Sequence, residues 1–284
     1  MAILLDGKQL KAKKLDEFKT RVDKLITKGI NPHLVVVQIG NNEASNVYIG
    51  HKQKMCEQLG IKSTKEWLPE DVSLEEFKKK IDSLNKDENI HGILVQFPLP
   101  AHIKNEEATM LIDPKKDVDG IHPLNQGINF TRTPEYAPIP CTANGIMEFF
   151  KEYNIPLEGK EVAIIGRSNI VGRPSSYLFA NANASVMMLH SRTNDETFKR
   201  VVKSADIIVL ATGMQDLITP EMIKQDSIII DVGIIRMDNG KLRGDILYRD
   251  FMDKCSYITP VPGGVGPMTV TMLMENLISL AEQK

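Results

Sequence analysis

The chain alternates short apolar runs rich in β-branched residues with longer stretches whose apolar residues recur every three or four positions. The first pattern is typical of buried strands and the second of amphipathic helices, so the alternation predicts α/β architecture with a parallel sheet. In the first half we expect strands at 33–40, 61–68 and 91–100 and helices at 44–59 and 73–85. Gly60 should end the first helix, and Ser73 with Glu76 should form a capping box on the second.

The second half repeats this pattern after a loop-rich segment at 113–141. A helix over 142–154, capped at Thr142, should connect the two halves, and the domain boundary should fall near it. Strands are expected near 161–165, 185–190, 206–210 and 227–231, followed by a last helix at about 268–282.

Composition narrows the class of protein. The 284 residues suit one large domain or two smaller ones, and a net charge of -2 argues against a nucleic-acid or anionic-membrane partner. No apolar run approaches the ~20 residues that span a bilayer, and the start lacks the pattern of a signal peptide. Three scattered cysteines and no paired histidine spacing favour a reducing cytoplasm and no metal.

The segment after Ile165 has the pattern of a strand–turn–helix unit. Gly166 ends the strand, and Gly172 and Pro174 open a helix whose N-terminal amides suit a pyrophosphate. The G-x-x-x-x-x-G spacing also fits an ordinary turn. At the end of the next strand, an acidic residue would indicate NAD. His190, Ser191 and Arg192 stand there instead, and a hydroxyl and a guanidinium suit the 2′-phosphate of NADP.

Other segments carry candidate chemistry. "DPKKDVDG" (113–120) lacks the carboxylates of an EF-hand, and we interpret it as an acidic turn or as an anchor for ring N–H donors. "PGGVGP" (262–267) is rigid and lets backbone approach a ligand closely. Gln96 ends a parallel strand, where ligands bind in α/β sheets. Tyr48 and Lys52, four residues apart, lie on one helix face.

Together these segments resemble the bifunctional methylenetetrahydrofolate dehydrogenase/cyclohydrolases along essentially the whole chain. The matching motifs, in the family's order, are "YIGHK", "GILVQFPLP", "KDVDGIHPLNQG", "GRSNIVGRP", "HSRT" and "TPVPGGVGPMT". The resemblance implies NADP-dependent oxidation of 5,10-methylenetetrahydrofolate to the 5,10-methenyl cation. It also implies hydrolysis of that cation to 10-formyltetrahydrofolate.

The resemblance implies a two-domain α/β fold with a cleft between the domains. Residues 1–145, joined by the C-terminal helix 268–284, would form the folate domain, and 146–267 a Rossmann-like NADP-binding domain. It also implies a homodimer.

The same resemblance implies roles for individual residues. The catalytic positions are Lys52, Tyr48, Gln96 and Asp119, with Tyr48 stacking on the substrate and Asp119 binding the pterin. Further substrate-binding positions are Val95, Phe97, Pro262, Gly263, Gly264, Val265 and Gly266. The cofactor-binding positions are Gly166, Arg167, Ser168, Ser191 and Ile234, to which the 2′-phosphate argument adds Arg192.

Lys52 has a chemical reason to be the proton shuttle. An exposed lysine is protonated at neutral pH, but burial beside the methenyl cation lowers the pKa of its amine. The neutral amine then accepts a proton from the attacking water and returns it during ring opening, with Gln96 orienting it.

Two departures from the family pattern stand out. Ala143 replaces a proline at the start of the connecting helix, and Phe97 adds bulk beside Gln96. Neither removes a catalytic group.

Two rival functions explain the sequence less completely. A shikimate- or amino-acid-type dehydrogenase explains the second half but not Lys52, Gln96 and Asp119. A non-catalytic folate-binding protein would not need the glycine-containing turn from Gly166 to Gly172, which suits a cofactor.

Overall fold

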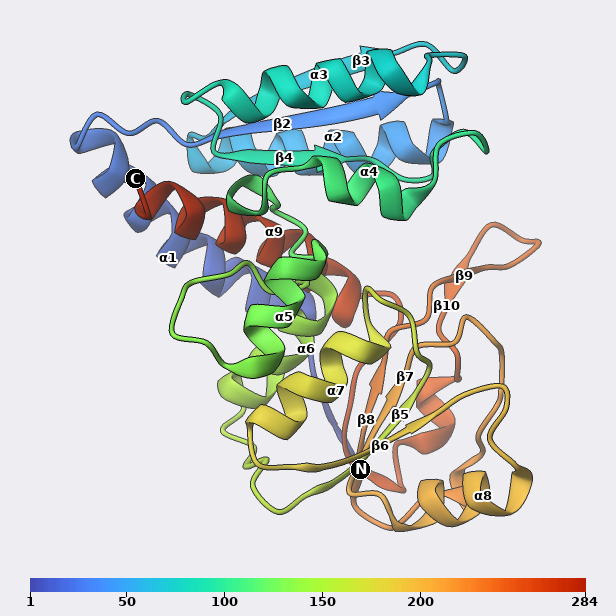
Figure 1. Cartoon of the computed structure of the whole chain (residues 1–284). Helices are drawn as coiled ribbons and strands as arrows, with labels where there is room; N and C mark the ends of the chain where they lie inside the picture. The colour runs from blue at the N-terminus through green and yellow to red at the C-terminus, as the bar shows by residue number, and fades with distance from the viewer. The chain divides into compact units, whose positions relative to one another are not determined.

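The computed structural model describes residues 1–284, apart from the side chain of Ala44 (Figure 1). The chain forms two compact units: unit 1 contains Met1–Ala12 and Pro140–Met272, and unit 2 contains Lys13–Ile139 and Leu273–Lys284. Helices α1 (Gly7–Thr27) and α9 (Val265–Glu282) have residues in both units. The sequence assigned residues 1–12 to the N-terminal domain. The structure places them in unit 1, because β1 (Ile3–Leu4) pairs with β11 (Cys255–Ile258).

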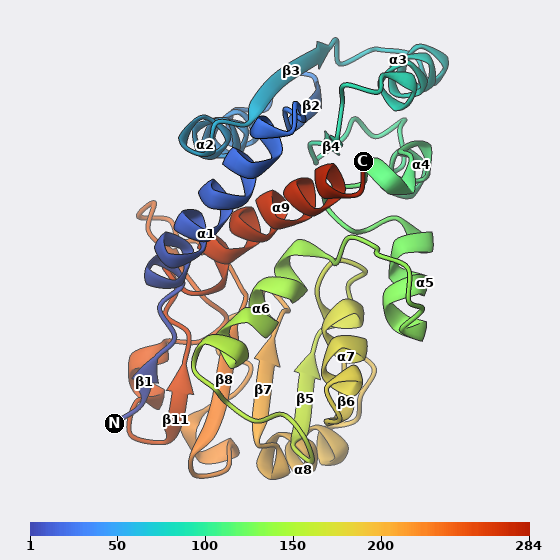
Figure 2. The same cartoon turned by 90° about the vertical axis from the view of Figure 1, so that its left-hand side faces the viewer.

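Unit 1 is built on a six-stranded sheet in the order β1-β11-β8-β7-β5-β6 (Figure 2). Its neighbouring strands pair in parallel. The remaining strands are β5 (Glu161–Ile165), β6 (Ser185–Leu189), β7 (Ile207–Leu210) and β8 (Ser227–Asp231). Strands β7 and β8 are buried along their whole length, which fits the continuous apolar run of β7 and the three isoleucines at the centre of β8. These four strands confirm the pattern predicted for the second half.

Three helices complete the main layers of unit 1: α6 (Cys141–Glu152), α7 (Gly172–Asn181) and α8 (Asp195–Ser204). The side chains of Val201 and Val202 on α8 join the core cluster that contains Ala163 and Ile165 of β5. The rings of Phe150 on α6 and Phe179 on α7 meet edge to face, with their centroids 5.3 Å apart. Smaller elements are the antiparallel hairpin β9 (Ile235–Arg236) and β10 (Leu242–Arg243), and 3-10 turns at Pro220–Met222 and Tyr248–Phe251.

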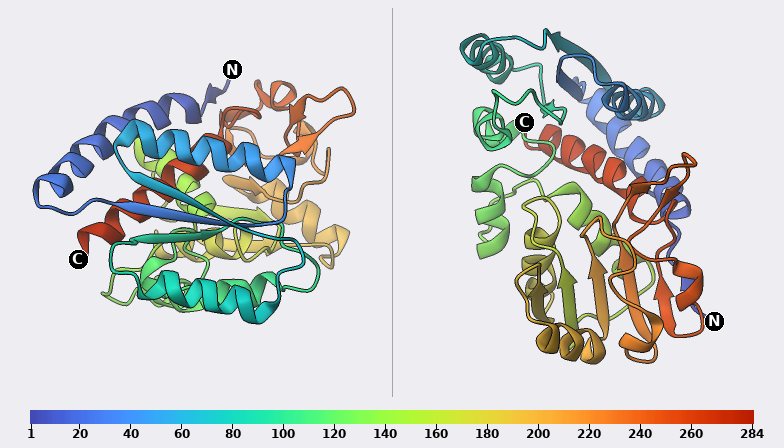
Figure 3. Two further views of the ribbon diagram at one scale, coloured as in Figure 1. Left: turned by 90° about the horizontal axis from the view of Figure 1, so that it is seen from above. Right: turned by 90° about the vertical axis from the view of Figure 1, so that its right-hand side faces the viewer.

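Unit 2 contains a three-stranded parallel sheet in the order β3-β2-β4. Its elements are β2 (His33–Ile39), α2 (Glu43–Leu59), β3 (Lys62–Leu68), α3 (Leu74–Lys86), β4 (Gly92–Val95), α4 (Asn105–Leu111), the 3-10 turn Pro114–Lys116 and α5 (Pro123–Thr131). Helices α2 and α3 lie on opposite faces of the sheet (Figure 3). Phe77 and Ile81 of α3 pack with Val35, Val37 and other apolar residues of one face.

Local sequence signals predicted the end of α2 and the start of α3 in unit 2. Gly60 ends α2 in the left-handed conformation, with a φ of 76°. Ser73 and Glu76 form the predicted capping box at the start of α3: the Ser73 hydroxyl accepts the Glu76 N–H, and the Glu76 carboxylate accepts the Ser73 N–H. Both predictions are confirmed.

Two sequence predictions were wrong. Thr142 does not cap the connecting helix: α6 begins at Cys141 without a side-chain cap, and the Thr142 hydroxyl hydrogen-bonds the Thr269 hydroxyl instead. The segment predicted as loop-rich contains α5, which begins at Pro123 and is capped by His122. Proline is well suited to a first helical turn because no amide hydrogen is needed there.

Within the described residues, no helix combines the length and the apolar character needed to cross a membrane. The same residues contain no group of three or more His, Cys, Asp or Glu side chains placed to hold a metal ion.

Candidate active site

The structure brings Lys52 and Gln96 together in unit 2. Lys52 lies on α2, and Gln96 follows directly on the last residue of β4. The Lys52 ammonium donates a 2.8 Å hydrogen bond to Oε1 of Gln96, whose Nε2 donates to the Phe97 carbonyl oxygen at 2.7 Å. The second bond fixes which end of the amide faces the lysine, so Lys52 is held in one orientation.

Asp119 lies close enough to Lys52 for their charges to interact. Its side chain is partly buried, and burial raises the pKa of this carboxyl to about 6. The positive charge of Lys52 opposes this increase in the pKa, whereas the negative charge of Asp117 adds to it. The structure thus gathers Lys52, Gln96 and Asp119 from three separate segments of unit 2.

Asp117, which sequence reasoning did not select, organises the loop that carries Asp119. Its carboxylate is 1% exposed and accepts the N–H groups of Gly120 and His122 and the Nδ2 group of Asn125. Burial raises the pKa of Asp117 as well. The acidic-turn interpretation of "KDVDG" therefore describes Asp117, whose carboxylate holds the turn together. The anchor interpretation, for Asp119, stays a prediction.

The other predicted folate residues of unit 2 differ in exposure. Tyr48 is 49% exposed, one turn before Lys52 on α2, so its ring has a face to offer a flat ligand. Val95 is only 4% exposed and packs in the core against β2 and α3. Phe97 is partly buried against the same core, while its carbonyl oxygen accepts hydrogen bonds from Gln96 and Ser45.

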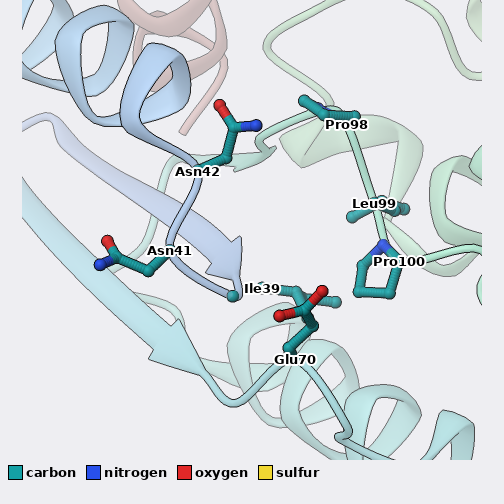
Figure 4. Close-up of a pocket in the computed structure, with 8 residues that line it drawn as sticks. Ile39, Asn41, Asn42, Glu70, Pro98, Leu99 and Pro100 are labelled. Carbon is teal, nitrogen blue, oxygen red and sulfur yellow. The ribbon is translucent and has the colours of Figure 1, made fainter.

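A pocket of about 350 Å³ opens at the carboxyl ends of β2 and β4 (Figure 4). Ile39 ends β2, Asn42 caps α2, and Pro98 follows two residues after Gln96, with Glu70 on the opposite wall. Lys52, Gln96 and Asp119 do not line it. It occupies the sheet edge at which open α/β sheets bind ligands.

In unit 1, the loop at 262–266 is held by close backbone contacts. The Gly7 N–H donates to the Gly263 carbonyl oxygen at 2.9 Å, and any side chain at Gly7 would overlap the Gly264 backbone. Val265 is 2% exposed at the start of α9. A side chain at Gly266 would lie 3.6 Å from Cδ1 of Ile234, so this loop and the predicted cofactor contact Ile234 are neighbours.

The turn between β5 and α7 is tightly packed. Gly166 has a φ of 130°, and a side chain there would overlap the Ala211 carbonyl. The Ser168 hydroxyl accepts the N–H groups of Val171 and Gly172, at 3.1 and 3.4 Å. Arg167 and Ser168 are both exposed.

A second turn follows β6 and presents Ser191 and Arg192, both exposed. It is fixed by hydrogen bonds between His190 and Thr193, with the His190 N–H donating to the Thr193 hydroxyl at 3.0 Å. Strand β6 pairs with β5 in parallel, so this turn and the Gly166 turn lie at the same edge of the sheet. The geometry therefore supports a phosphate-rich ligand in unit 1 and a proton-transfer centre in unit 2.

Comparison with known proteins matches both halves of the chain to one family. Residues 5–119 match the catalytic domain of tetrahydrofolate dehydrogenase/cyclohydrolase, and residues 140–284 match its NAD(P)-binding domain. The bifunctional protein FolD of Ligilactobacillus salivarius is 47% identical over 283 residues, covering 100% of this chain and 98% of that protein.

Two solved structures are similar over nearly the whole chain. The bifunctional methylenetetrahydrofolate dehydrogenase/cyclohydrolase FolD of Campylobacter jejuni has a TM-score of 0.97 at 44% identity, covering 100% of this chain and 99% of that one. The dehydrogenase-cyclohydrolase of Trypanosoma brucei, solved with NADP and an inhibitor, has a TM-score of 0.93 at 34% identity, covering 99% and 98%. The chain belongs to the tetrahydrofolate dehydrogenase/cyclohydrolase family.

Proposed function

We propose that this chain oxidises 5,10-methylenetetrahydrofolate with NADP and then hydrolyses the 5,10-methenyl product to 10-formyltetrahydrofolate. The observation that carries this proposal is the cluster of Lys52, Gln96 and Asp119 in unit 2 of a chain that belongs to this family. This chemistry needs an amine that can exchange a proton beside a cation, an amide that orients the amine, and a carboxylate that binds the substrate.

In the hydrolysis, Lys52 is proposed to act as the proton shuttle. Water adds to the methenyl carbon, and the Lys52 amine takes the proton that the water loses. The bond from this carbon to the ring nitrogen then breaks, and the same proton returns to that nitrogen as the ring opens. The remaining hydroxyl proton is released to solvent as the formyl carbonyl forms, so that the reaction yields one proton overall. The hydrogen bond from Lys52 to Gln96 keeps the amine in place during both transfers.

The remaining folate contacts follow from the placement of each residue. Asp119 accepts N–H groups of the pterin ring, and the exposed ring of Tyr48 stacks on the flat substrate. Backbone groups carry the roles proposed for Val95 and the 262–266 loop, since the side chains of Val95 and Val265 are buried. The carbonyl oxygen of Phe97 accepts a hydrogen bond from the Gln96 amide and thereby orients it.

The residues of unit 1 fit NADP, which supplies the hydride acceptor of the oxidation when bound. The Gly166 turn, with Arg167 and Ser168, is proposed to hold the pyrophosphate beside the N-terminus of α7. Ser191 and Arg192 are proposed to bind the 2′-phosphate, and their exposure supports this role. Ile234 is 50% exposed and follows β8, which is separated from β6 by β7 and β5 in the sheet. It is proposed to contact the part of the cofactor that lies away from β6.

Two further properties are part of the proposal. The chain works as a homodimer, as its family resemblance implies. It works in the cytoplasm, a reducing compartment that suits three buried cysteines.

Two absorbance assays test the proposed function. Purified protein given methylenetetrahydrofolate and NADP should produce the absorbance of reduced nicotinamide, and NAD should replace NADP poorly. Methenyltetrahydrofolate supplied alone should lose its own absorbance faster than in buffer. Folded protein that fails both assays would overturn the proposal.

A further inference from the structure

Two buried carboxylates lie at the carboxyl edge of the unit 1 sheet, outside the residues assigned to the site above. Asp231 ends β8 and is 1% exposed, and Asp245 follows β10 and is 0% exposed. Burial raises the pKa of Asp231 to about 6, and the nearby charge of Asp245 adds to the increase. Burying two neighbouring carboxylates is unfavourable unless their oxygens accept hydrogen bonds. The partner of each oxygen therefore indicates what the two carboxylates do.

Asp231 ties together the segments that follow β8 and β10. Its Oδ1 accepts the N–H groups of Gly233 and Asp245, each at 3.0 Å, and its Oδ2 accepts the Ile246 N–H at 3.1 Å. Three backbone donors on one carboxylate fix the backbone of both segments.

Asp245 reaches the segment after β7. Its Oδ2 accepts both the N–H and the hydroxyl of Thr212, at 2.9 and 2.7 Å. Its Oδ1 has no hydrogen-bond partner among the described residues. That oxygen faces Gly233, where any side chain would overlap it, and Gly244 lies against Asp231 in the same way. The two aspartates and two glycines thus form one interlocked unit, which we call the aspartate clamp (Asp231, Asp245, Gly233 and Gly244).

The clamp lies where one half of a dinucleotide would bind. Strand β5, with the pyrophosphate turn, lies between β6 and β7 in the sheet. Because the 2′-phosphate turn follows β6, the adenosine half occupies that side, and the nicotinamide half extends over β7 and β8. Thr212 follows β7, and Ile234 follows directly on Gly233 after β8.

We propose that Asp231 and Asp245 are positioning residues for hydride transfer. Through Thr212 and Gly233, the clamp holds the two segments on which the nicotinamide half of NADP rests, and it sets the place of Ile234. This inference rests on the proposed function. It assigns the clamp to the oxidation alone, because water addition to the methenyl cation needs no cofactor.

Measuring both activities on each variant tests the clamp. Asp245→Ala leaves the Thr212 donors without an acceptor, so it should raise the KM for NADP and lower dehydrogenase kcat, together by about 10–100-fold. Cyclohydrolase activity on supplied methenyltetrahydrofolate should stay at the wild-type level. Asp245→Asn keeps an oxygen acceptor for Thr212 and should recover most of the dehydrogenase activity.

A matched control comes from the opposite edge of the same sheet. Asp206 precedes β7, and its carboxylate accepts the Glu161 N–H at 3.0 Å and the Lys224 ammonium at 2.6 Å. Asp206→Ala should lower the thermal unfolding midpoint without changing the ratio of the two activities. If Asp245→Ala does not fold, Thr212→Val removes one clamp hydrogen bond and should produce a smaller change in the same direction.

Three results would overturn the inference. These are a wild-type KM for NADP in folded Asp245→Ala, a proportional loss of both activities in that variant, and unchanged kinetics in Thr212→Val. Failure of the proposed function would be seen separately, as a wild-type protein without dehydrogenase activity.

Discussion

Replacing Asp119 by Asn should make the protein more stable at neutral pH while weakening its hold on folate. The carboxyl is partly buried, and its pKa rises from 3.8 to about 6 mainly because burial disfavours the charged form. A carboxyl with a raised pKa binds its proton more tightly in the native state than in the unfolded state. The free energy of unfolding of the wild type therefore falls as pH rises from about 4 to about 6, and it stays low above that range.

The magnitude follows from the two pKa values. Their difference corresponds to at most about 3 kcal/mol, at about 1.4 kcal/mol for each pH unit, and partial exposure of Asp119 reduces this to about 1–2 kcal/mol. Asn is neutral throughout, so Asp119→Asn should exceed the wild type by this amount at pH 7.5 and match it near pH 4. Urea unfolding at both pH values measures the difference.

The same substitution should separate stability from function. Loss of charge-assisted hydrogen bonds to the pterin should weaken folate binding by about 1.5–3 kcal/mol, with NADP affinity unchanged. In the wild type, kcat/KM for folate should fall below pH 6 as Asp119 is protonated, and this fall should disappear in the variant.

Asp113→Asn is the matched control. It changes a carboxylate of the same loop, whose oxygen accepts the Lys115 N–H, and Asn is an equally good cap for that turn. A stability difference between Asp119→Asn and the wild type that did not depend on pH would refute the burial argument. Normal folate affinity in the variant would refute the anchor.

Three further predictions concern other groups. Lys52→Gln should lower cyclohydrolase activity by about 10²–10⁴-fold and dehydrogenase activity less, because glutamine positions substrate but cannot cycle a proton. Equal losses in the two assays would make Lys52 a positioning residue. Arg192→Ala should weaken NADP binding by about 1.5–3 kcal/mol in a titration, with NAD use barely changed; equal losses for both cofactors would indicate a structural role. Lys116→Met should lower the free energy of unfolding by about 2–3 kcal/mol, because the buried ammonium group donates to three carbonyl oxygens at and just beyond the end of α3. An unchanged urea midpoint would contradict this last expectation.

Local signals explain the parts of the fold that the sequence predicted well. The capping box at Ser73 and the left-handed Gly60 act within one helical turn, and the apolar run of β2 needs only burial on both faces. Helix α5 has weaker signals, since Leu124 and Phe130 are more than half exposed and interrupt the apolar periodicity after Pro123. It is fixed instead by Asn125, which donates to the Pro114 carbonyl oxygen and to Asp117.

The candidate site also combines residues that the sequence predicted with contacts that the sequence could not predict. Tyr48 and Lys52 meet on one helix face by spacing alone, and Gln96 could be placed because it ends a parallel strand. The hydrogen bond between Lys52 and Gln96 could be expected only from the family, because it joins residues 44 apart in the chain. Asp117 was missed because an acidic residue in a loop usually faces water.

The missed aspartates nevertheless share a sequence signal. The loop after a parallel strand has several backbone N–H groups that need hydrogen-bond acceptors. One buried carboxylate can accept three of these hydrogen bonds. Asp231 does so as the last residue of β8, and Asp117 does so in a loop that pairs with β4. In both cases a glycine follows within three residues, which lets the backbone turn back toward the carboxylate. The buried charge lowers stability, but it holds the loop rigid where a ligand must be aligned. The Asp245 variants test that exchange in unit 1, because Asp245 accepts both Thr212 donors after β7.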